Sequence, residues 1–111
     1  MKLITAMIRP YRLDDVREVV AAMGLMGLTV TETEEYGVAT HTEVYRGAEY
    51  RVDWAARARI ELAVEDAVAE QVVEAICNIA RTGRRGDGRV FVSCLSEAVR
   101  IRTGETGTAA L

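Results

Sequence analysis

The sequence predicts an α+β fold in which two strand–helix–strand units form one antiparallel four-stranded sheet with two helices on one face. Two stretches repeat apolar residues at the helical period, and each lies between stretches with the character of strands. With 111 residues, the chain has room for a single domain (1–111), because two smaller pieces would each bury too little apolar surface. Strand–helix–strand twice over is the ferredoxin-like double βαβ sandwich. Its second sheet face has no cover, which predicts an oligomer.

The first unit begins at a short apolar run. Residues 3–8 are mostly apolar and end before Pro10, as expected for a buried strand and its exit. A helix follows, because Asp14 and Asp15 stand where a helix N-terminus favours negative charge. Its apolar stripe recurs at i, i+3, i+4 and i+7 and consists of Val16, Val19, Val20 and Met23. Residues 28–34 alternate as a strand does, and they predict the second strand.

Residues 35–54 follow neither period and predict a long flexible loop. They combine two Gly, three Tyr and charges of both signs. So long a loop in a small domain is uncommon and is usually functional. A tyrosine exposed in such a loop is a partner contact or a modification site, although any one of Tyr36, Tyr45 and Tyr50 is more often folded back onto the domain. His41, the one histidine, is a polar loop residue in this interpretation.

The second unit repeats the pattern of the first. Residues 59–64 alternate like a strand, and Glu65 and Asp66 open a helix. The apolar stripe of this helix consists of Val68, Val72, Ile76 and Ile79. The helix ends at residues 81–83, and a short loop rich in Gly leads to a last strand at residues 89–93.

The net charge of −3 argues against general nucleic-acid binding, but the charge is unevenly distributed. Residues 1–80 carry 8 basic and 14 acidic side chains, a net charge of −6. Residues 81–102 carry six Arg against Asp87 and Glu97, a net charge of +4. A positive site in an acidic protein suggests a small anionic ligand rather than a polyanion.

Apolar patterning and cysteine content indicate the compartment. No apolar run approaches the roughly 20 residues of a membrane span, so membrane insertion is not expected. The opening MKLITAMIRP has too short an apolar stretch for a signal peptide. Cys77 and Cys94 lack the spacing of metal ligands and are expected to be reduced thiols without a redox role. These features together predict a cytoplasmic protein.

The strongest chemical signal is the Gly-rich segment at residues 82–89. Three Gly in this segment let backbone N–H groups approach an anion closely, and Arg85 and Arg89 add positive charge. The segment alone is equally consistent with a plain turn that carries solvated arginines. Arg100 and Arg102 favour phosphate binding, because their alternation in an extended segment would put both guanidinium groups on one side.

Four pieces of the sequence together resemble the PII family of signal transducers. They are MKLITAMIRPYRLDDVREVV, THTEVYRGAEY, ARTGRRGDGRVFVS and VRIRTGETG, and the likeness covers nearly the whole chain. The resemblance implies homotrimers of ferredoxin-like subunits whose sheets line the centre, with ATP and ADP competing for three sites between subunits. It also implies a signalling protein that is not an enzyme.

The resemblance assigns roles to individual residues. Gly86, Asp87, Gly88 and Arg89 would bind the phosphates, with Arg89 in place of the family's usual Lys. Arg100 and Arg102 would reach the same phosphates across the subunit interface. The remaining positions are Thr29 and Ala63 near the adenine, Gly37 and Val38 at the base of the long loop, and Arg57, where the family keeps a Lys that pairs with 2-oxoglutarate.

The long loop corresponds to the T-loop of the resembled family. That loop contacts target proteins such as ammonium channels in the membrane and enzymes of nitrogen metabolism. Tyr50 matches the tyrosine that is uridylylated or adenylylated in many members. Recruitment to the membrane by a transporter partner would follow from such a contact.

The sequence departs from the family pattern at the base of this loop. Many members read Gly-Phe-Gly-Arg-Gln-Lys-Gly-His, whereas residues 35–41 read Glu-Tyr-Gly-Val-Ala-Thr-His, one residue fewer. The family's Arg contacts phosphate and its Gln helps to hold Mg²⁺ beside 2-oxoglutarate, and Val38 and Ala39 can do neither. Glu35 also brings negative charge close to the expected anions. We therefore expect ADP or ATP binding to survive, and Mg²⁺-dependent 2-oxoglutarate binding to be weak or lost.

Three other functions are open at this stage. The chain could be a divergent energy sensor for a system other than nitrogen, such as bicarbonate or metal transport. It could be an acylphosphatase-like hydrolase, since that activity occurs on the same fold, but the sequence offers no activated nucleophile or positioned base. An RNA-binding sheet would need several aromatic residues on its central strands, and Phe91 alone is too few.

Overall fold

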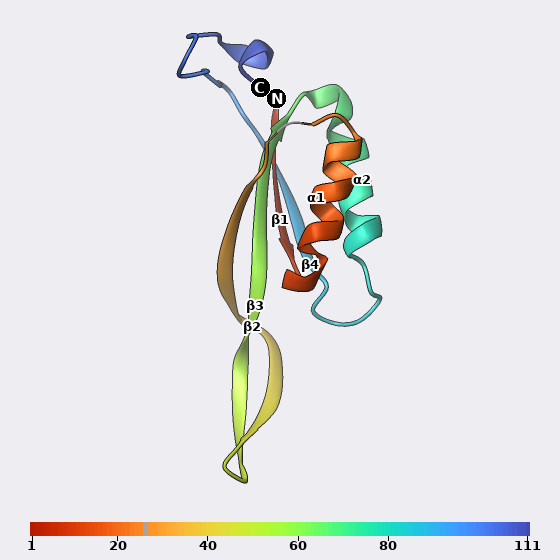
Figure 1. Cartoon of the computed structure of the whole chain (residues 1–111), viewed down its shortest axis with the longest axis vertical. Helices are drawn as coiled ribbons and strands as arrows, with labels where there is room; N and C mark the ends of the chain where they lie inside the picture. Colours follow the sequence, from red (N-terminus) through yellow and green to blue (C-terminus); the bar gives the residue numbers. More distant parts are fainter. Residues whose placement is uncertain (26) are drawn as a thin grey trace.

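The computed structural model describes residues 1–25 and 27–111, without the side chains of residues 38–41 and 43. In this part of the chain, four strands form one antiparallel sheet in the order β2-β3-β1-β4. The strands are β1 (Lys2–Ile8), β2 (Thr29–Tyr45), β3 (Ala48–Val64) and β4 (Gly88–Cys94), and the helices are α1 (Leu13–Ala22) and α2 (Asp66–Ala80). Figure 1 shows α1 and α2 together on one side of the sheet. The predicted α+β arrangement is therefore confirmed.

The hydrophobic core lies between the helices and the adjoining sheet face. Strand β1 runs between β3 and β4, and Ile4 is opposite both Leu62 and Val92. Alternate residues of β1 point to the helices and are buried, namely Ile4, Ala6 and Ile8. The helices meet them with the stripes that the sequence predicted, of which Val16, Val20, Val72 and Ile76 are buried. Each such side chain stabilises the fold by about 1.5–3 kcal/mol through burial.

The opposite face of the sheet has no helix over it (Figure 1). It carries the other set of alternating residues, including Leu3, Thr5 and Met7 of β1, which are only partly buried. Phe91 lies opposite Thr5 and is 51% exposed. A single chain thus leaves apolar side chains uncovered on this face, as the double βαβ pattern led us to expect.

The prediction of an irregular loop at residues 35–54 is wrong. These residues continue β2 and β3 as a two-stranded hairpin, which projects beyond the body of the molecule in Figure 1. Its turn is formed by Arg46 and Gly47, whose φ angles of 52° and 79° suit a two-residue hairpin turn. The register shifts between Tyr36 and His41, so an irregularity separates the projecting hairpin from the sheet body.

The strand pattern in the hairpin was invisible because neither of its faces is buried. Val44, Tyr45 and Tyr50 are 70%, 61% and 53% exposed. Alternation of apolar and polar residues arises where one face packs on a core, and this ribbon packs on none. Backbone pairing alone defines these strands. Among the described residues, no helix has both the length and the apolarity needed to cross a membrane.

Candidate functional site

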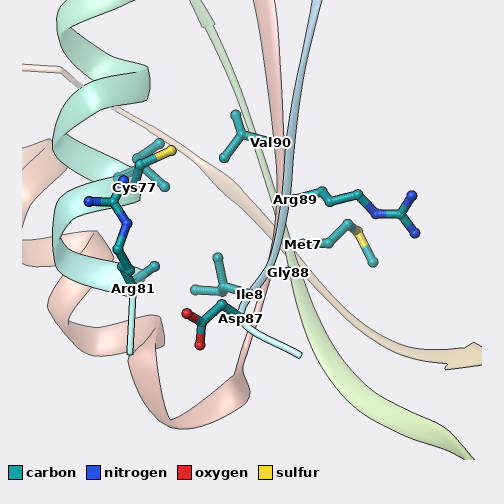
Figure 2. Close-up of a pocket in the computed structure, with 10 residues that line it drawn as sticks. Met7, Ile8, Cys77, Arg81, Asp87, Gly88, Arg89 and Val90 are labelled. Atoms are coloured by element: carbon teal, nitrogen blue, oxygen red, sulfur yellow. The ribbon is translucent and has the colours of Figure 1, made fainter. Parts of the chain in front are cut away.

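The Gly-rich loop lies where three parts of the chain converge. It connects α2 to β4. It lies beside the C-terminal end of β1, at the same end of the sheet as the hairpin base. Gly88 pairs with Ile8, and Ile8 pairs with Ala58 of β3. Figure 2 shows the neighbourhood of this loop, with Arg89 and Met7 on the opposite side of the strands from Cys77 and Arg81.

Asp87 holds the Gly-rich loop in shape. Its carboxylate accepts the backbone N–H groups of Thr82 and Gly83 at 2.9 Å each, and also the Thr82 hydroxyl. Arg9 donates its Nε to the same carboxylate at 3.2 Å. The Thr82 hydroxyl, followed by the backbone N–H groups and Arg9, holds the pKa of Asp87 well below its ordinary value. The carboxylate is therefore ionised at neutral pH, and it already occupies two N–H groups that a phosphate could otherwise use.

Two glycines of the loop are required by what lies beside them. A Cβ on Gly88 would stand 1.7 Å from the carbonyl oxygen of Met7, and its φ is +102°. A Cβ on Gly86 would stand 3.3 Å from Nη2 of Arg57 and 3.5 Å from Nη2 of Arg9. Gly88 thus permits the pairing of β4 with β1, and Gly86 leaves room for two guanidinium groups.

Three arginines and one glutamate surround the loop. Arg57 is 5% exposed and donates its Nε to Oε2 of Glu35 at 3.0 Å and its Nη1 to the carbonyl of Ala56 at 3.3 Å. Arg89 donates its Nη2 to Oε1 of the same Glu35 at 3.4 Å. Arg9 donates to the carbonyl of Arg85 at 2.8 Å. The cluster of Arg9, Arg57 and Arg89 therefore exceeds by one charge the two carboxylates, Glu35 and Asp87, that contact it.

The cavity drawn in Figure 2 is too small to hold a nucleotide. It has a volume of about 160 Å³ and lies between α2 and the ends of β1 and β4. Pockets for small molecules usually measure about 300–1,000 Å³. This cavity is therefore smaller than a usual small-molecule pocket.

Two predicted residues of the sheet body lie away from this loop, with Ala63 near the far end of the sheet and Thr29 level with the middle of β1. Ala63 pairs with Leu3, and Thr29 pairs with Glu61, and both Ala63 and Thr29 are exposed. The C-terminal segment that carries Arg100 leaves β4 at this same end (Figure 1). Six residue steps along β4 separate Gly88 from Cys94, a distance of about 20 Å. The structure brings Arg57 to the Gly-rich loop, and it keeps Thr29, Ala63, Arg100 and Arg102 away from it.

The extended segment expected at Arg100 and Arg102 is a turn instead. Arg100 donates its N–H to the carbonyl of Glu105 at 2.9 Å and accepts the N–H of Gly104 at 2.8 Å. Gly104, with a φ of +73°, and the Val99–Thr106 bridge close this turn. The Arg100 side chain binds the carbonyl of Leu111 at 3.0 Å and lies 3.5 Å from the Glu105 carboxylate. The two guanidinium groups are therefore not aligned by strand alternation.

Three predicted positions belong to the hairpin. Gly37, with a φ of +78°, lies at the register shift at the hairpin base. Val38 follows it, and its side chain lies outside the described part of the structure, as does that of His41. Tyr50 is exposed near the hairpin tip, where a partner or a modifying enzyme has access to it.

Arg9 is the site residue that the sequence analysis missed. It stands between β1 and Pro10, and nothing in its local pattern separates it from an ordinary surface arginine. Its contacts with Asp87 and Arg85 span more than 70 residues of sequence, so only the fold reveals them. Among the described residues, no group of three or more His, Cys, Asp or Glu side chains could hold a metal ion.

Comparison with known proteins gives a consistent result. The family profile described as nitrogen regulatory protein P-II matches residues 1–105. Proteins named nitrogen regulatory protein P-II from Rhodospirillum rubrum and Rhizobium meliloti are 53% and 52% identical to this chain, with 96% and 100% of each chain covered. The protein of that name from Haemophilus influenzae is 49% identical, with 95% of each chain covered.

Proposed function

The chain belongs to the nitrogen regulatory protein P-II family, and from this premise we propose that it binds ADP or ATP between the subunits of a homotrimer. Like the family described as nitrogen regulatory protein P-II, it is a regulatory protein of signal transduction rather than an enzyme. Nucleotide occupancy would set the conformation of the hairpin at residues 36–54, and the hairpin would bind or release a target protein.

The observation that carries this proposal is the division of the site between two ends of one sheet. The Gly-rich loop with Arg57 and Arg89 adjoins the Gly88 end of β4. Arg100 and Arg102 follow its Cys94 end, and the two ends of β4 are about 20 Å apart. The phosphates of one nucleotide cannot contact both groups in the same chain. Two chains packed through their uncovered sheet faces could supply one group each, which supports a site at the interface.

The charges of the loop end suit a phosphate group. Arg9, Arg57 and Arg89 converge there, and guanidinium groups pair well with phosphate oxygens. Gly86 has no side chain to fill the space beside Arg9 and Arg57, so an anion could approach both guanidinium groups. The pKa of Asp87 is depressed, so its carboxylate stays ionised; it is held within the loop and serves the loop's shape.

The hairpin base supplies a physical link from nucleotide to target. Glu35 of β2 contacts Arg57 and Arg89, and Gly37 follows two residues later at the register shift. A ligand that changes the partners of these arginines changes the contacts that hold the base. Such a link is needed because a ligand shifts an equilibrium only by its different affinities for the two states.

The target is proposed to be a membrane transporter or a metabolic enzyme that a cytoplasmic P-II protein contacts through its hairpin. Tyr50 is exposed near the hairpin tip and is the proposed site of nucleotidyl modification. Val38 and Ala39 lack the groups that would hold Mg²⁺ beside 2-oxoglutarate, so we propose a weak or absent response to this dicarboxylate. Isothermal titration of 2-oxoglutarate with Mg-ATP present tests this, and tight binding would contradict it.

A complementation experiment tests the divided site. Arg89→Ala removes a cation from the loop end, and the double change Arg100→Ala with Arg102→Ala removes the cations of the far end. Each variant alone should lose most of its ADP affinity. After co-refolding in equal amounts, about a quarter of the interfaces would combine one intact end from each variant and regain wild-type affinity.

The outcome of mixing decides between interface sites and sites within one chain. Recovery of high-affinity sites only after co-refolding supports the interface. If the mixture binds no better than the separate variants, the site does not lie between subunits. A monomeric wild-type protein by light scattering would contradict the proposal independently.

A second candidate function is a divergent P-II energy sensor for a system other than nitrogen, such as bicarbonate or metal transport. The changed hairpin base at residues 35–41 is the observation that supports it. Both versions bind adenine nucleotides, so they are distinguished by the response to 2-oxoglutarate and by the target protein.

A further inference from the structure

The Glu35 carboxylate forms ion pairs with two arginines that an anionic ligand would also need. Its Oε2 lies 3.0 Å from Nε of Arg57, and its Oε1 lies 3.4 Å from Nη2 of Arg89. The carboxylate thus sits between a buried arginine and an exposed one, since Arg57 is 5% and Arg89 61% exposed. Glu35 itself is 18% exposed.

The two contacts of Glu35 differ in how easily they can be broken. Arg57 is buried, and a buried guanidinium group needs a carboxylate or several acceptors, so its pair with Glu35 is part of the folded structure. The Arg89 contact is longer and lies at the surface, where water screens it. Arg89 can therefore leave Glu35 at little cost, whereas Arg57 cannot.

The Arg89 contact also crosses the sheet. Glu35 belongs to β2 and Arg89 to β4, which are the two edge strands in the order β2-β3-β1-β4. The pair therefore connects the base of the hairpin with the strand that follows the Gly-rich loop. An anion that takes Arg89 would end this connection.

We propose that Glu35 is a built-in competitor that sets the affinity and specificity of the anion site. Its carboxylate stands in for a ligand's anionic group on Arg89, and a nucleotide phosphate must displace it there while Arg57 retains it. Ligands with several negative charges at one end, such as nucleoside di- and triphosphates, can outcompete it. Ligands with a single carboxylate or phosphate group at the site cannot. This inference rests on the proposed function, because it names the residue that tunes that same site.

The change Glu35→Gln separates the two contacts. The amide oxygen of Gln can still accept the Nε–H of Arg57, whereas its NH₂ group offers Arg89 no acceptor. Arg89 is released and one negative charge is removed beside the ligand. We expect the affinity for ADP and for inorganic tripolyphosphate, each titrated by calorimetry without Mg²⁺, to rise roughly 10-fold.

Two variants serve as controls for this experiment. Glu34→Gln removes the same charge from the adjacent residue of β2, which points to the opposite face and accepts the Tyr36 hydroxyl at 2.7 Å. It should leave both affinities within about twofold of the wild type. In the Arg89→Ala background, Glu35→Gln should give a clearly smaller gain, because the released cation is missing and only the loss of one negative charge remains.

The outcomes separate this inference from the proposed function. If the wild type binds ADP and Glu35→Gln binds it equally or more weakly, the competitor role is wrong while the nucleotide function stands. An equal gain from Glu34→Gln, or an undiminished gain in the Arg89→Ala background, would also overturn it. If no variant binds ADP, the proposed function fails, and the tripolyphosphate titration alone decides whether Glu35 competes.

Thermal unfolding establishes that the variants are folded. Should Glu35→Gln fail to fold, Glu35→Asp replaces it, because a side chain one methylene shorter keeps a charge beside Arg57 and withdraws from Arg89. It should then bind tripolyphosphate more tightly than the wild type, and an unchanged affinity would contradict the proposal.

Discussion

Strands β2 and β3 have two halves that differ in what lies beside them. In the half within the sheet body, Ile60 is fully buried, with β1 on one side of β3 and the helices above it. In the projecting half, the strands pair only with each other, and Val44 and Tyr50 are 70% and 53% exposed. One continuous pair of strands thus has a part that packs on a core and a part whose described apolar side chains Val44, Tyr45 and Tyr50 are exposed.

This difference indicates that the hairpin is the part of the molecule that can change shape. Stability is unevenly distributed in folded proteins, and a two-stranded ribbon without a buried face is marginal by itself. The hairpin can therefore alter its conformation without disturbing the core. At its base, Glu35 contacts both Arg57 and Arg89, so contacts of the hairpin, the sheet body and the Gly-rich loop meet there.

The largest expected effect comes from matched glycine substitutions in the two regions. Gly88→Ala puts a Cβ 1.7 Å from a β1 carbonyl and should cost about 4 kcal/mol of unfolding free energy or more, or prevent folding. Gly47→Ala at the hairpin turn has a φ of +79° but meets nothing within 4 Å, so it should cost only the backbone strain of about 1–2 kcal/mol. Urea unfolding at one protein concentration measures both unfolding free energies. Similar losses for the two variants would contradict the predicted difference between the regions.

Matched truncations of apolar side chains should give the next largest difference. Ile60→Ala leaves a cavity in the core and should lower the unfolding free energy by about 2–5 kcal/mol. Val44→Ala on the exposed ribbon should change it by less than about 0.5 kcal/mol. A loss above about 1 kcal/mol for Val44→Ala would show that the hairpin packs on the body in solution.

Acid should weaken the loop end of the body more than the hairpin. Because its pKa is lowered in the folded state, Asp87 stabilises the protein fully above its ordinary pKa of 3.8, and this contribution is lost as the pH falls below that value. The wild type should therefore lose more stability between pH 5 and pH 3 than Asp87→Asn does. Asp53→Asn on the hairpin is the control and should follow the wild type. If the unfolding free energies of all three proteins fall equally with pH, Asp87 does not stabilise the fold in this way.

Replacing residues 40–50 with a Gly-Ser linker should have the smallest effect on the body. The melting temperature should shift by no more than a few degrees, and ADP affinity should stay within about threefold, because no core residue is removed. Binding of the target protein should be lost. Loss of ADP affinity together with target binding would contradict the separation of the two regions.

Part of the candidate site could be predicted from the sequence. Local composition singles out the Gly-rich segment and Arg89 as a candidate site, and the family resemblance adds Arg57, which the structure brings to the same loop. Arg9 could not be found in this way, because its partner Asp87 is 78 residues distant along the chain. The turn at Arg100 was missed because alternation of two arginines is a weak signal beside Gly104, whose positive φ closes the turn.

The sequence by itself determined the elements that bury a face. Both helices and the core strands could be predicted from the regular spacing of their apolar residues, since packing against a core imposes this spacing. Only the tertiary structure decided that residues 35–54 pair as strands, that the two predicted halves of the nucleotide site adjoin opposite ends of β4 in one chain, and that Glu35 joins Arg57 to Arg89. Those features arise from contacts between segments distant in sequence, and no local pattern of side chains records them.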